Sequence, residues 1–149
     1  MTEYRVVIPD EIFAALEWQD EGLPAICMVN QSLANFEPKP VFAWHLSIIV
    51  EFADPSANGL PASGENELLG QIGQHFDLHL KSDGNAMFLA RITWNGTRQF
   101  LYRVYDPEVA NTFLTDILEN GKEVRPLDYK MEHDVDWTLA KWYLQNWEE

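Results

Sequence analysis

The stretch Val41-Phe42-Ala43-Trp44-His45-Leu46-Ser47-Ile48-Ile49-Val50-Glu51-Phe52 decides the fold. Because successive side chains of a β-strand leave opposite faces, every second residue shares a face. One face of this stretch is apolar throughout, with Phe42, Trp44, Leu46, Ile48, Val50 and Phe52. The other face carries His45, Ser47 and Glu51 among small or aliphatic residues. The sequence therefore predicts a central strand whose apolar face covers a core and whose second face is free for function.

Length and composition predict one domain over residues 1–149. Hydrophobic residues make up 46% of the chain and aromatic residues 13%, which supplies a core and argues against disorder. The 24 acidic residues outnumber the 10 basic ones, for a net charge of −14. Because such a surface repels phosphate backbones, we expect no direct binding to nucleic acid.

The cysteine content and the hydropathy pattern bear on location. Cys27 is the single cysteine and lies in an apolar run, so we expect a buried, inert thiol and no disulfide within the chain. Met1-Thr2-Glu3-Tyr4-Arg5 lacks the apolar segment of a signal peptide, and no stretch approaches about 18 apolar residues. These features predict a cytoplasmic protein without a membrane partner.

Residues 11–18 fit two structures. Asp10 is placed to cap a helix that Gly22 would end. Alternatively, Ala14, Leu16 and Trp18 alternate as in a strand, and a turn at residues 20–22 leads into a second strand over 23–29. We favour the hairpin.

Two amphipathic helices flank a second hairpin. The first is predicted from an N-cap at Ser63 to a stop near residues 82–85, and the second from an N-cap at Asp106 to Gly121. Between them, Asn95-Gly96 joins two β-prone runs and is typical of a type I′ turn. With a two-residue loop, three facing pairs are predicted: Thr93 with Arg98, Arg91 with Phe100, and Leu89 with Tyr102.

The order of elements from residue 41 onward indicates the fold class. A last strand is predicted over 123–131, with Pro126 at an edge, and the tail over 134–144 looks helical. Strand, helix, strand, strand, helix, strand is the split βαβ pattern of ferredoxin-like α+β folds, here over about residues 41–131. An N-terminal β-hairpin would precede this unit and a C-terminal helix would follow it, leaving His45, Ser47 and Glu51 on the open sheet face.

Several short motifs occur in the order seen in a known family. They are Gly22-Leu23-Pro24-Ala25-Ile26, Trp44-His45-Leu46-Ser47, Gly59-Leu60-Pro61, Trp94-Asn95-Gly96-Thr97-Arg98, Tyr102-Arg103-Val104-Tyr105-Asp106, and Asp136-Trp137 with Leu144. Through them the chain resembles the bacterial domain of unknown function 695 family over about residues 14–145. That resemblance implies no particular activity. Members look distantly similar to the regulator of ribonuclease E activity B, a small acidic protein with a related α/β arrangement that binds a nuclease.

The polar residues of the open face are too spread out to form a catalytic triad. A strand rises about 3.4 Å per residue, so Ser47 and Glu51 should lie about 13 Å apart, and His45 and Ser47 about 7 Å apart. A contact surface is therefore favoured over catalysis, with His45 as the one catalytic candidate.

Other candidate binding residues lie on the second hairpin and in the tail. On the two-residue loop register, Arg91 and Arg98 share a face with Tyr102, where they are placed to grip an anion or stack on a planar group. Internal pairing with the many carboxylates is the favoured alternative. Trp137 is a further binding candidate, although a core anchor is its simplest role.

No cofactor is predicted. His75 and His79 have the i, i+4 spacing of metal ligands, but no further ligands accompany them, so metal binding is disfavoured. Gly70 and Gly73 do not form a phosphate-binding loop.

These patterns lead to two functional hypotheses. The first is a non-enzymatic binding or regulatory module that engages a protein partner or a second copy of itself through the open sheet face. The alternative is a small-molecule-binding or hydrolytic enzyme built around His45, with Arg98 holding an anionic substrate.

Overall fold

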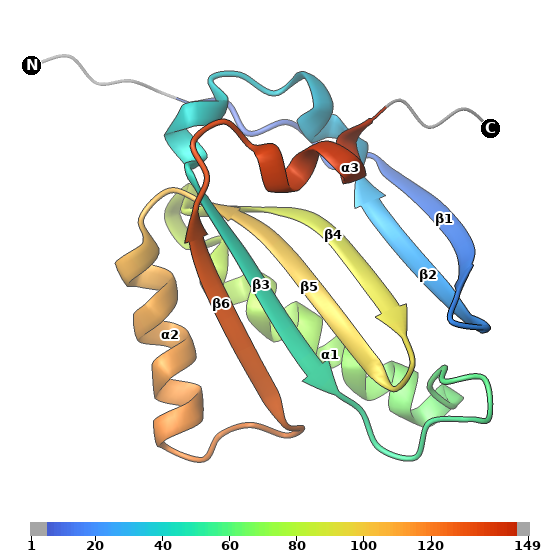
Figure 1. Ribbon diagram of the computed structural model, residues 1–149. Helices are drawn as coiled ribbons and strands as arrows, with labels where there is room; N and C mark the ends of the chain where they lie inside the picture. Colours follow the sequence, from blue (N-terminus) through green and yellow to red (C-terminus); the bar gives the residue numbers. More distant parts are fainter. Residues whose placement is uncertain (1–5, 146–149) are drawn as a thin grey trace, which may run out of the picture.

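A six-stranded antiparallel sheet organises residues 6–145, the part of the chain that the computed structural model describes (Figure 1). The prediction about Met1–Arg5 lies outside these residues. The strands are β1 (Phe13–Asp20), β2 (Leu23–Asn30), β3 (Trp44–Glu51), β4 (Ala86–Trp94), β5 (Thr97–Val104) and β6 (Leu127–His133), in the order β1-β2-β4-β5-β3-β6. The structure also contains three α-helices: α1 (Ser63–Leu80) between β3 and β4, α2 (Pro107–Glu119) between β5 and β6, and the short α3 (Lys141–Leu144) after β6. The predicted mixture of helices with an antiparallel sheet is confirmed.

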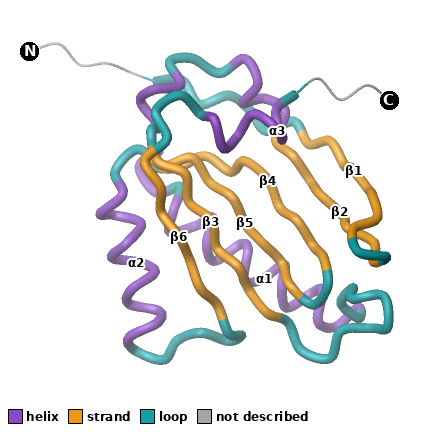
Figure 2. The backbone as a smooth tube through the Cα atoms, in the orientation of Figure 1, coloured by secondary structure: helices purple, strands orange, loops and turns teal. Residues whose placement is uncertain are grey.

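The apolar face of β3 packs against α1 and α2, as predicted. Leu46, Ile48 and Val50 are fully buried there. They share a core with Leu69 and Phe76 of α1, and with apolar side chains of α2. Figure 2 shows both long helices on the same side of the sheet, with β3 between β5 and β6. A strand with a wholly apolar face is thus placed at the centre of the four strands that the helices cover.

Residues 13–30 form the hairpin and not the alternative helix. β1 and β2 are joined by Glu21 and Gly22, which both have positive φ. β2 then pairs with β4, so the hairpin adds two strands to one edge of the sheet (Figure 1).

The register of the β4–β5 hairpin follows its turn. Asn95 and Gly96 both have positive φ, and the predicted pairs Thr93 with Arg98 and Arg91 with Phe100 are confirmed. The third predicted pair is wrong, because a β-bulge between Phe88 and Ala90 places Phe88, not Leu89, opposite Tyr102.

Four element boundaries differ from the predictions. The central strand, predicted over 41–52, begins at Trp44 and ends at Glu51, and Phe42 lies in a 3-10 turn and packs in a second core instead of facing the helices. Ala62, not Ser63, is the N-cap of α1. The last strand begins at Leu127 instead of residue 123. The predicted helix over 134–144 is reduced to a 3-10 turn (Thr138–Ala140) followed by α3, because Trp137 adopts a left-handed conformation with φ of 58°. The predicted N-cap of α2 at Asp106 is confirmed by a hydrogen bond from the Glu108 N–H to its side chain.

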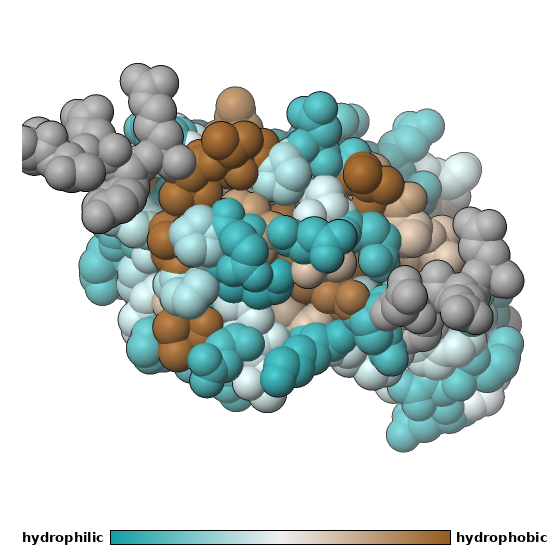
Figure 3. Space-filling model, turned by 90° about the horizontal axis from the view of Figure 1, so that it is seen from above, coloured by the Kyte–Doolittle hydropathy of each residue, from teal (hydrophilic) through white to brown (hydrophobic). Residues whose placement is uncertain are grey.

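The second face of the sheet is only half open. Two 3-10 turns (Gln31–Asn35 and Lys39–Phe42) and the C-terminal segment lie across its upper end in Figure 1 and enclose a second core. His45, predicted to look out on an open face, is therefore only 6% exposed. Figure 3 looks down on this end, where hydrophobic and hydrophilic residues alternate without one continuous apolar patch. Farther along β3, Ser47 is half-buried, and Ile49 and Glu51 are exposed.

Candidate functional site

A hollow of about 310 Å³ opens between the start of α1 and the helix-facing side of β2 and β4. The hairpin β1–β2 extends the sheet sideways from the four strands that share a core with α1 and α2, so α1 and the added strands meet at a corner. We call this the arginine hollow. Its lining residues are Ile26, Met28, Leu60, Pro61, Ser63, Asn66, Arg91, Thr93 and Arg98.

Arg98 is held rigidly in the wall of the arginine hollow. It is 5% exposed, its Nε–H donates to Thr93 Oγ1 at 2.9 Å, and its Nη2 donates to Asn66 Oδ1 at 2.8 Å. Its Nη1 bonds to no described residue. Because no fully buried side-chain nitrogen of residues 6–145 lacks a partner, Nη1 is accessible in a residue that lines the hollow. Burial, and secondarily the charge of Arg91, lowers the pKa of Arg98 to about 10.

Arg91 lies diagonally across the hairpin from Arg98. The two arginines are in neighbouring pairs on one sheet face, so their Cα atoms are about 7–8 Å apart. Arg91 is half-buried, and burial lowers its pKa. Within residues 6–145 it makes no hydrogen bond and no ion pair. The predicted arrangement of the two arginines on one face is thus confirmed.

The expected pairing with carboxylates is wrong for these two arginines. Ion pairs engage the other described Lys and Arg side chains except the exposed Lys141, namely Lys39, Lys81, Arg103, Lys122, Arg125 and Lys130. No Asp or Glu lines the arginine hollow. In a chain with 24 acidic residues, the two cations of this hollow therefore have no counter-ion among residues 6–145.

The start of α1 is fixed beside the arginines by two contacts. The Gly96 N–H donates to the Gly59 carbonyl at 2.9 Å and ties the preceding loop to the β4–β5 turn. Glu65 accepts two hydrogen bonds of 2.7 Å from Arg125, which lower the pKa of its carboxyl to about 2. Because Ala62 provides no side-chain cap, the first N–H groups of α1 remain available to an acceptor.

A second hollow of about 240 Å³ continues along α1. It shares Met28 and Arg91 with the arginine hollow, and these two residues face each other across β2 and β4. Gly70 and Gly73 form its helical wall. We call the two hollows together the α1 groove.

Tyr102, the third predicted residue of this face, lies in the wall of the second hollow. Its hydroxyl donates to Asp77, and burial together with that carboxylate raises the pKa of the phenol well above 10. It is therefore a neutral donor that is already occupied.

His45 and Trp137 lie on the opposite side of the sheet, around a buried arginine. The guanidinium of Arg103 is fully buried, donates to Asp134 Oδ2 at 2.9 Å and to the Phe42 carbonyl, and stacks 4.6 Å from the Trp137 ring. Its Nη1 lies 3.3 Å from His45 Nδ1. Burial, and next the charge of Arg103, lowers the pKa of His45 to about 4, so the imidazole is neutral at pH 7.

The predicted combination of His45 with Arg98 is wrong. His45 faces Arg103, whereas Arg98 faces Val50, so His45 and Arg98 leave opposite faces of the sheet and cannot act on one substrate. Ser47 accepts a 2.6 Å hydrogen bond from Gln99, on the same side as His45.

His75 and His79, the two histidines with metal-ligand spacing for which metal binding is disfavoured, both contact Phe113. The rings of His75 and His79 are 4.6 Å apart, and His79 lies parallel to Phe113. Within residues 6–145 no three His, Cys, Asp or Glu side chains come together to hold a metal. Cys27 is fully buried, and burial raises the pKa of its thiol to about 12.

The sequence did not point to Ser63, Asn66 or Gly70 as site residues. The sequence predicts Ser63 only as the N-cap of a helix. No sequence pattern marks Asn66 as a binding residue. Gly70 does carry a sequence signal, because a glycine in the interior of a predicted helix lowers helix stability relative to alanine.

Comparisons with known proteins identify a family and no individual relative. No curated protein and no solved structure matches the chain, so the distant similarity to the regulator of ribonuclease E activity B stays a prediction. None of the helices in residues 6–145 combines the length and hydropathy needed to span a bilayer. Residues 18–145, nearly the whole length, match the Family of unknown function (DUF695), and the chain belongs to that family.

Proposed function

We propose that this protein binds a small molecule bearing a carboxylate or phosphate, with the anion seated between Arg91 and Arg98. One observation carries the proposal: two guanidinium groups share a hollow that contains no carboxylate, in a protein of net charge −14. A buried cation without a counter-ion is unfavourable unless something compensates it. A bound anion would supply that compensation.

The chemistry of the hollow suits an anion with several oxygens. Arg98 offers Nη1 from a side chain already fixed by Thr93 and Asn66, and Arg91 has no hydrogen bond or ion pair within residues 6–145 to give up. A guanidinium presents paired N–H groups that match carboxylate and phosphate geometry. The uncapped start of α1 adds N–H donors and the positive end of a helix dipole beside Ser63.

Binding without turnover is the simpler role for this hollow. Its lining contains no His, Cys, Asp or Glu to act as a base or nucleophile. Of its two hydroxyl groups, that of Thr93 is bonded to Arg98, and Ser63 has no base in the lining to activate it.

The test is calorimetric titration with inorganic phosphate and with acetate. We expect Arg91→Gln to weaken binding about tenfold or more, since a hydrogen bond to a charged group contributes about 1.5–3 kcal/mol. Because Arg91 has no partner within residues 6–145, this change should leave folding intact. Arg98→Gln should weaken binding at least as much.

Lys141→Gln is the matched control, since it removes one positive charge from an exposed side chain that makes no ion pair with any of residues 6–145. An equal loss of affinity in this variant would show non-specific attraction and overturn the proposal. So would the failure of both anions to bind the native protein at millimolar concentration.

A second candidate function is docking of a basic protein on the uncovered half of the sheet, which consists of Ile49, Glu51, Gln99, Asp128 and Lys130. Ile49 is 43% exposed, an unusual position for a β-branched side chain in a central strand. The charge of Lys130 is balanced by Glu132, 2.9 Å away. Glu51 and Asp128 have no ion-pair partner among residues 6–145. This arrangement suits a partner with an apolar centre and a basic rim.

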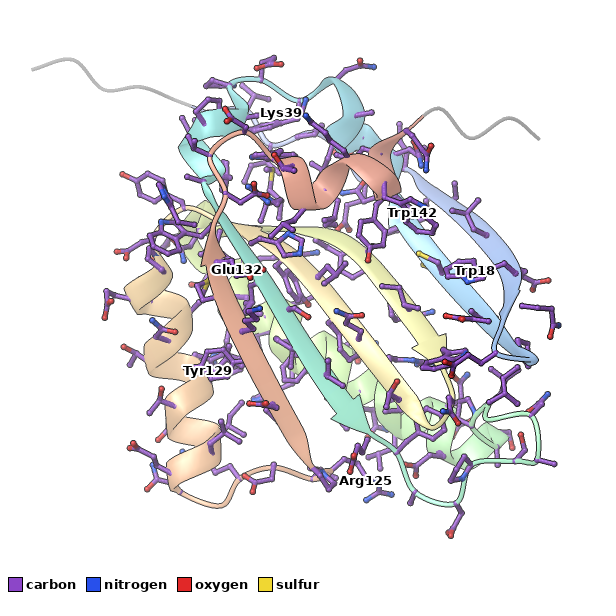
Figure 4. The ribbon with its side chains drawn as sticks, in the orientation of Figure 1. Trp18, Lys39, Arg125, Tyr129, Glu132 and Trp142 are labelled. Carbon is purple, nitrogen blue, oxygen red and sulfur yellow. The ribbon has the colours of Figure 1, made fainter. Side chains whose placement is uncertain are left out.

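Figure 4 shows Trp142 of the C-terminal segment close to Trp18 of β1, on the side of the sheet that holds the second core. Their ring centroids are 5.3 Å apart in an edge-to-face contact. Trp is among the residues that most often anchor protein interfaces.

The docking candidate is tested with a Lys- and Arg-rich peptide that has a central Leu-Phe pair, by fluorescence anisotropy. The double variant Glu51→Lys, Asp128→Lys should weaken binding. The control with Glu108→Lys and Glu119→Lys on α2 should not. A stable dimer of the native protein in sedimentation analysis would point to a second copy as the occupant instead.

The ferredoxin-like classification is also a proposal. The strand order β4-β5-β3-β6 with α1 and α2 on one face supports a split βαβ unit, to which β1 and β2 are added at the edge. A crystal structure with statistically significant similarity to ferredoxin-like domains would test it.

A further inference from the structure

Gly70 has no structural reason to be a glycine. It lies in the interior of α1, where glycine is unfavourable relative to alanine. A Cβ added at Gly70 would meet no heavy atom within 4 Å. Gly73, one turn on, is different, because a Cβ there would lie 3.0 Å from the Phe100 ring. Packing therefore explains Gly73 and leaves Gly70 unexplained.

The empty space beside Gly70 belongs to the α1 groove. Gly70 lines the second hollow, which meets the arginine hollow at Met28 and Arg91. From Asn66 to Asp77, the helical wall of the groove is about 16 Å long. Any side chain at Gly70 would project into this passage.

We infer that the ligand is an elongated organic acid, with its carboxylate or phosphate at Arg91 and Arg98 and an apolar chain lying over Gly70. This inference rests on the proposed anion site and adds the class of molecule. Phe13, Met28 and Phe100 give the second hollow an apolar lining. Such a lining favours methylene groups or an aromatic ring over a second polar head.

The carboxylates at the far end of the groove already have partners within the protein. Lys81 Nζ lies 2.9 Å from Glu11 and 3.5 Å from Asp77, and Asp77 also accepts the hydroxyl hydrogen bond of Tyr102. Because two carboxylates share one ammonium group, this end keeps a net negative charge and disfavours a second anionic group on the ligand. A single anionic head at the arginines, followed by an apolar chain, fits this distribution.

The experiment uses calorimetry to compare the affinity of the protein for simple anions with its affinity for the same anions carrying an alkyl chain. The probes are acetate, butyrate, hexanoate and octanoate in one series, and inorganic phosphate, butyl phosphate and hexyl phosphate in the other. In the native protein we expect affinity to rise by up to about fourfold for each buried methylene group until the groove is full. The series with the tighter binding identifies the head group.

Gly70→Leu separates the two parts of the site. It should bind acetate and inorganic phosphate as the native protein does, and lose the gain in affinity with chain length. Gly64→Leu is the control, because Gly64 lies in the same helix, also has open space around it, and lines neither hollow. It should keep the full dependence on chain length.

The outcomes distinguish this inference from the proposed function. If the simple anions bind and depend on Arg91, but chain length or Gly70→Leu has no effect, the elongated ligand is wrong and the anion site stands. If no probe of either series binds, or binding is indifferent to Arg91→Gln, both are wrong. Chain-length dependence that survives Gly70→Leu places the chain elsewhere and overturns the inference.

Discussion

His45 illustrates how burial changes the role of a residue that looks catalytic in the sequence. Its imidazole is enclosed by the second core, beside Arg103, Asp134 and Glu132. A desolvated histidine next to a buried cation resists protonation. Its contribution is therefore to the pH dependence of stability.

We predict that acidification from pH 6.5 to 4 destabilises the protein through His45 by about 3 kcal/mol, since its pKa is lowered from 6.5 to about 4. Below pH 6.5 the unfolded chain takes up a proton at this position that the folded protein does not. Stability therefore rises with pH across this window and is lost as the pH falls. Urea unfolding at several pH values measures the slope.

The variant for this prediction is His45→Gln, which removes the buried imidazole. It should flatten the profile between pH 4 and 6.5. A profile that stays equally steep in the His45 variant would contradict a neutral, buried imidazole.

At the scale of elements, local signals predicted most of what the chain forms. Asn95-Gly96 determined the turn and two strand pairs, and Asp106-Pro107 determined the start of α2, because these rules depend on neighbouring residues alone. The bulge at Phe88 and Ala90 and the distorted C-terminal tail could not be found this way. The tail depends on contacts with distant parts of the chain, such as the Asp134 N–H bond to the Ala43 carbonyl.

The loop before α1 provides a prediction about elements. Gly59 has φ of +81°, and a Cβ there would lie 2.8 Å from the Asn95 Cα atom. Gly22 has a similar φ of +78° but open space around it. Gly22→Ala should therefore cost about 1 kcal/mol for backbone strain alone. Gly59→Ala should cost about 1–3 kcal/mol more, because backbone atoms collide.

Chemical denaturation of the two variants measures this difference. Equal losses would mean that the loop moves away from the β4–β5 turn without penalty. Since that contact positions the start of α1, a displaced loop in Gly59→Ala should also weaken anion binding, while Gly22→Ala should not affect it.

For the molecule as a whole, half of the candidate site could be predicted. The pattern of alternating faces placed Arg91 and Arg98 together. The absence of a carboxylate beside them could not be deduced, because it depends on where α1 and the β1–β2 hairpin lie in space. The prediction of an open sheet face is wrong for the same reason. Residues 31–42 and 134–145, which come from distant parts of the chain, cover half of that face.

The two cores on opposite faces of the sheet differ in how they can open. The helix-facing core lies between the sheet and the helices α1 and α2. The second core is closed by a cap built around Trp137. Trp137 is 2% exposed, and its indole N–H donates to the Lys39 and Phe42 carbonyls. This cap can undock without breaking a strand pair. We therefore expect local opening on this face.

Cys27 reports that opening, because it is fully buried in the second core and is the only cysteine. We predict that Trp137→Ala costs about 3–5 kcal/mol and makes Cys27 react with a disulfide reagent faster than global unfolding allows. Leu114→Ala, in the helix-facing core, is the matched control. In the Leu114→Ala variant, Cys27 should react only as fast as global unfolding of that variant permits. If both variants follow global unfolding alike, the cap and the sheet unfold as one unit and local opening is wrong.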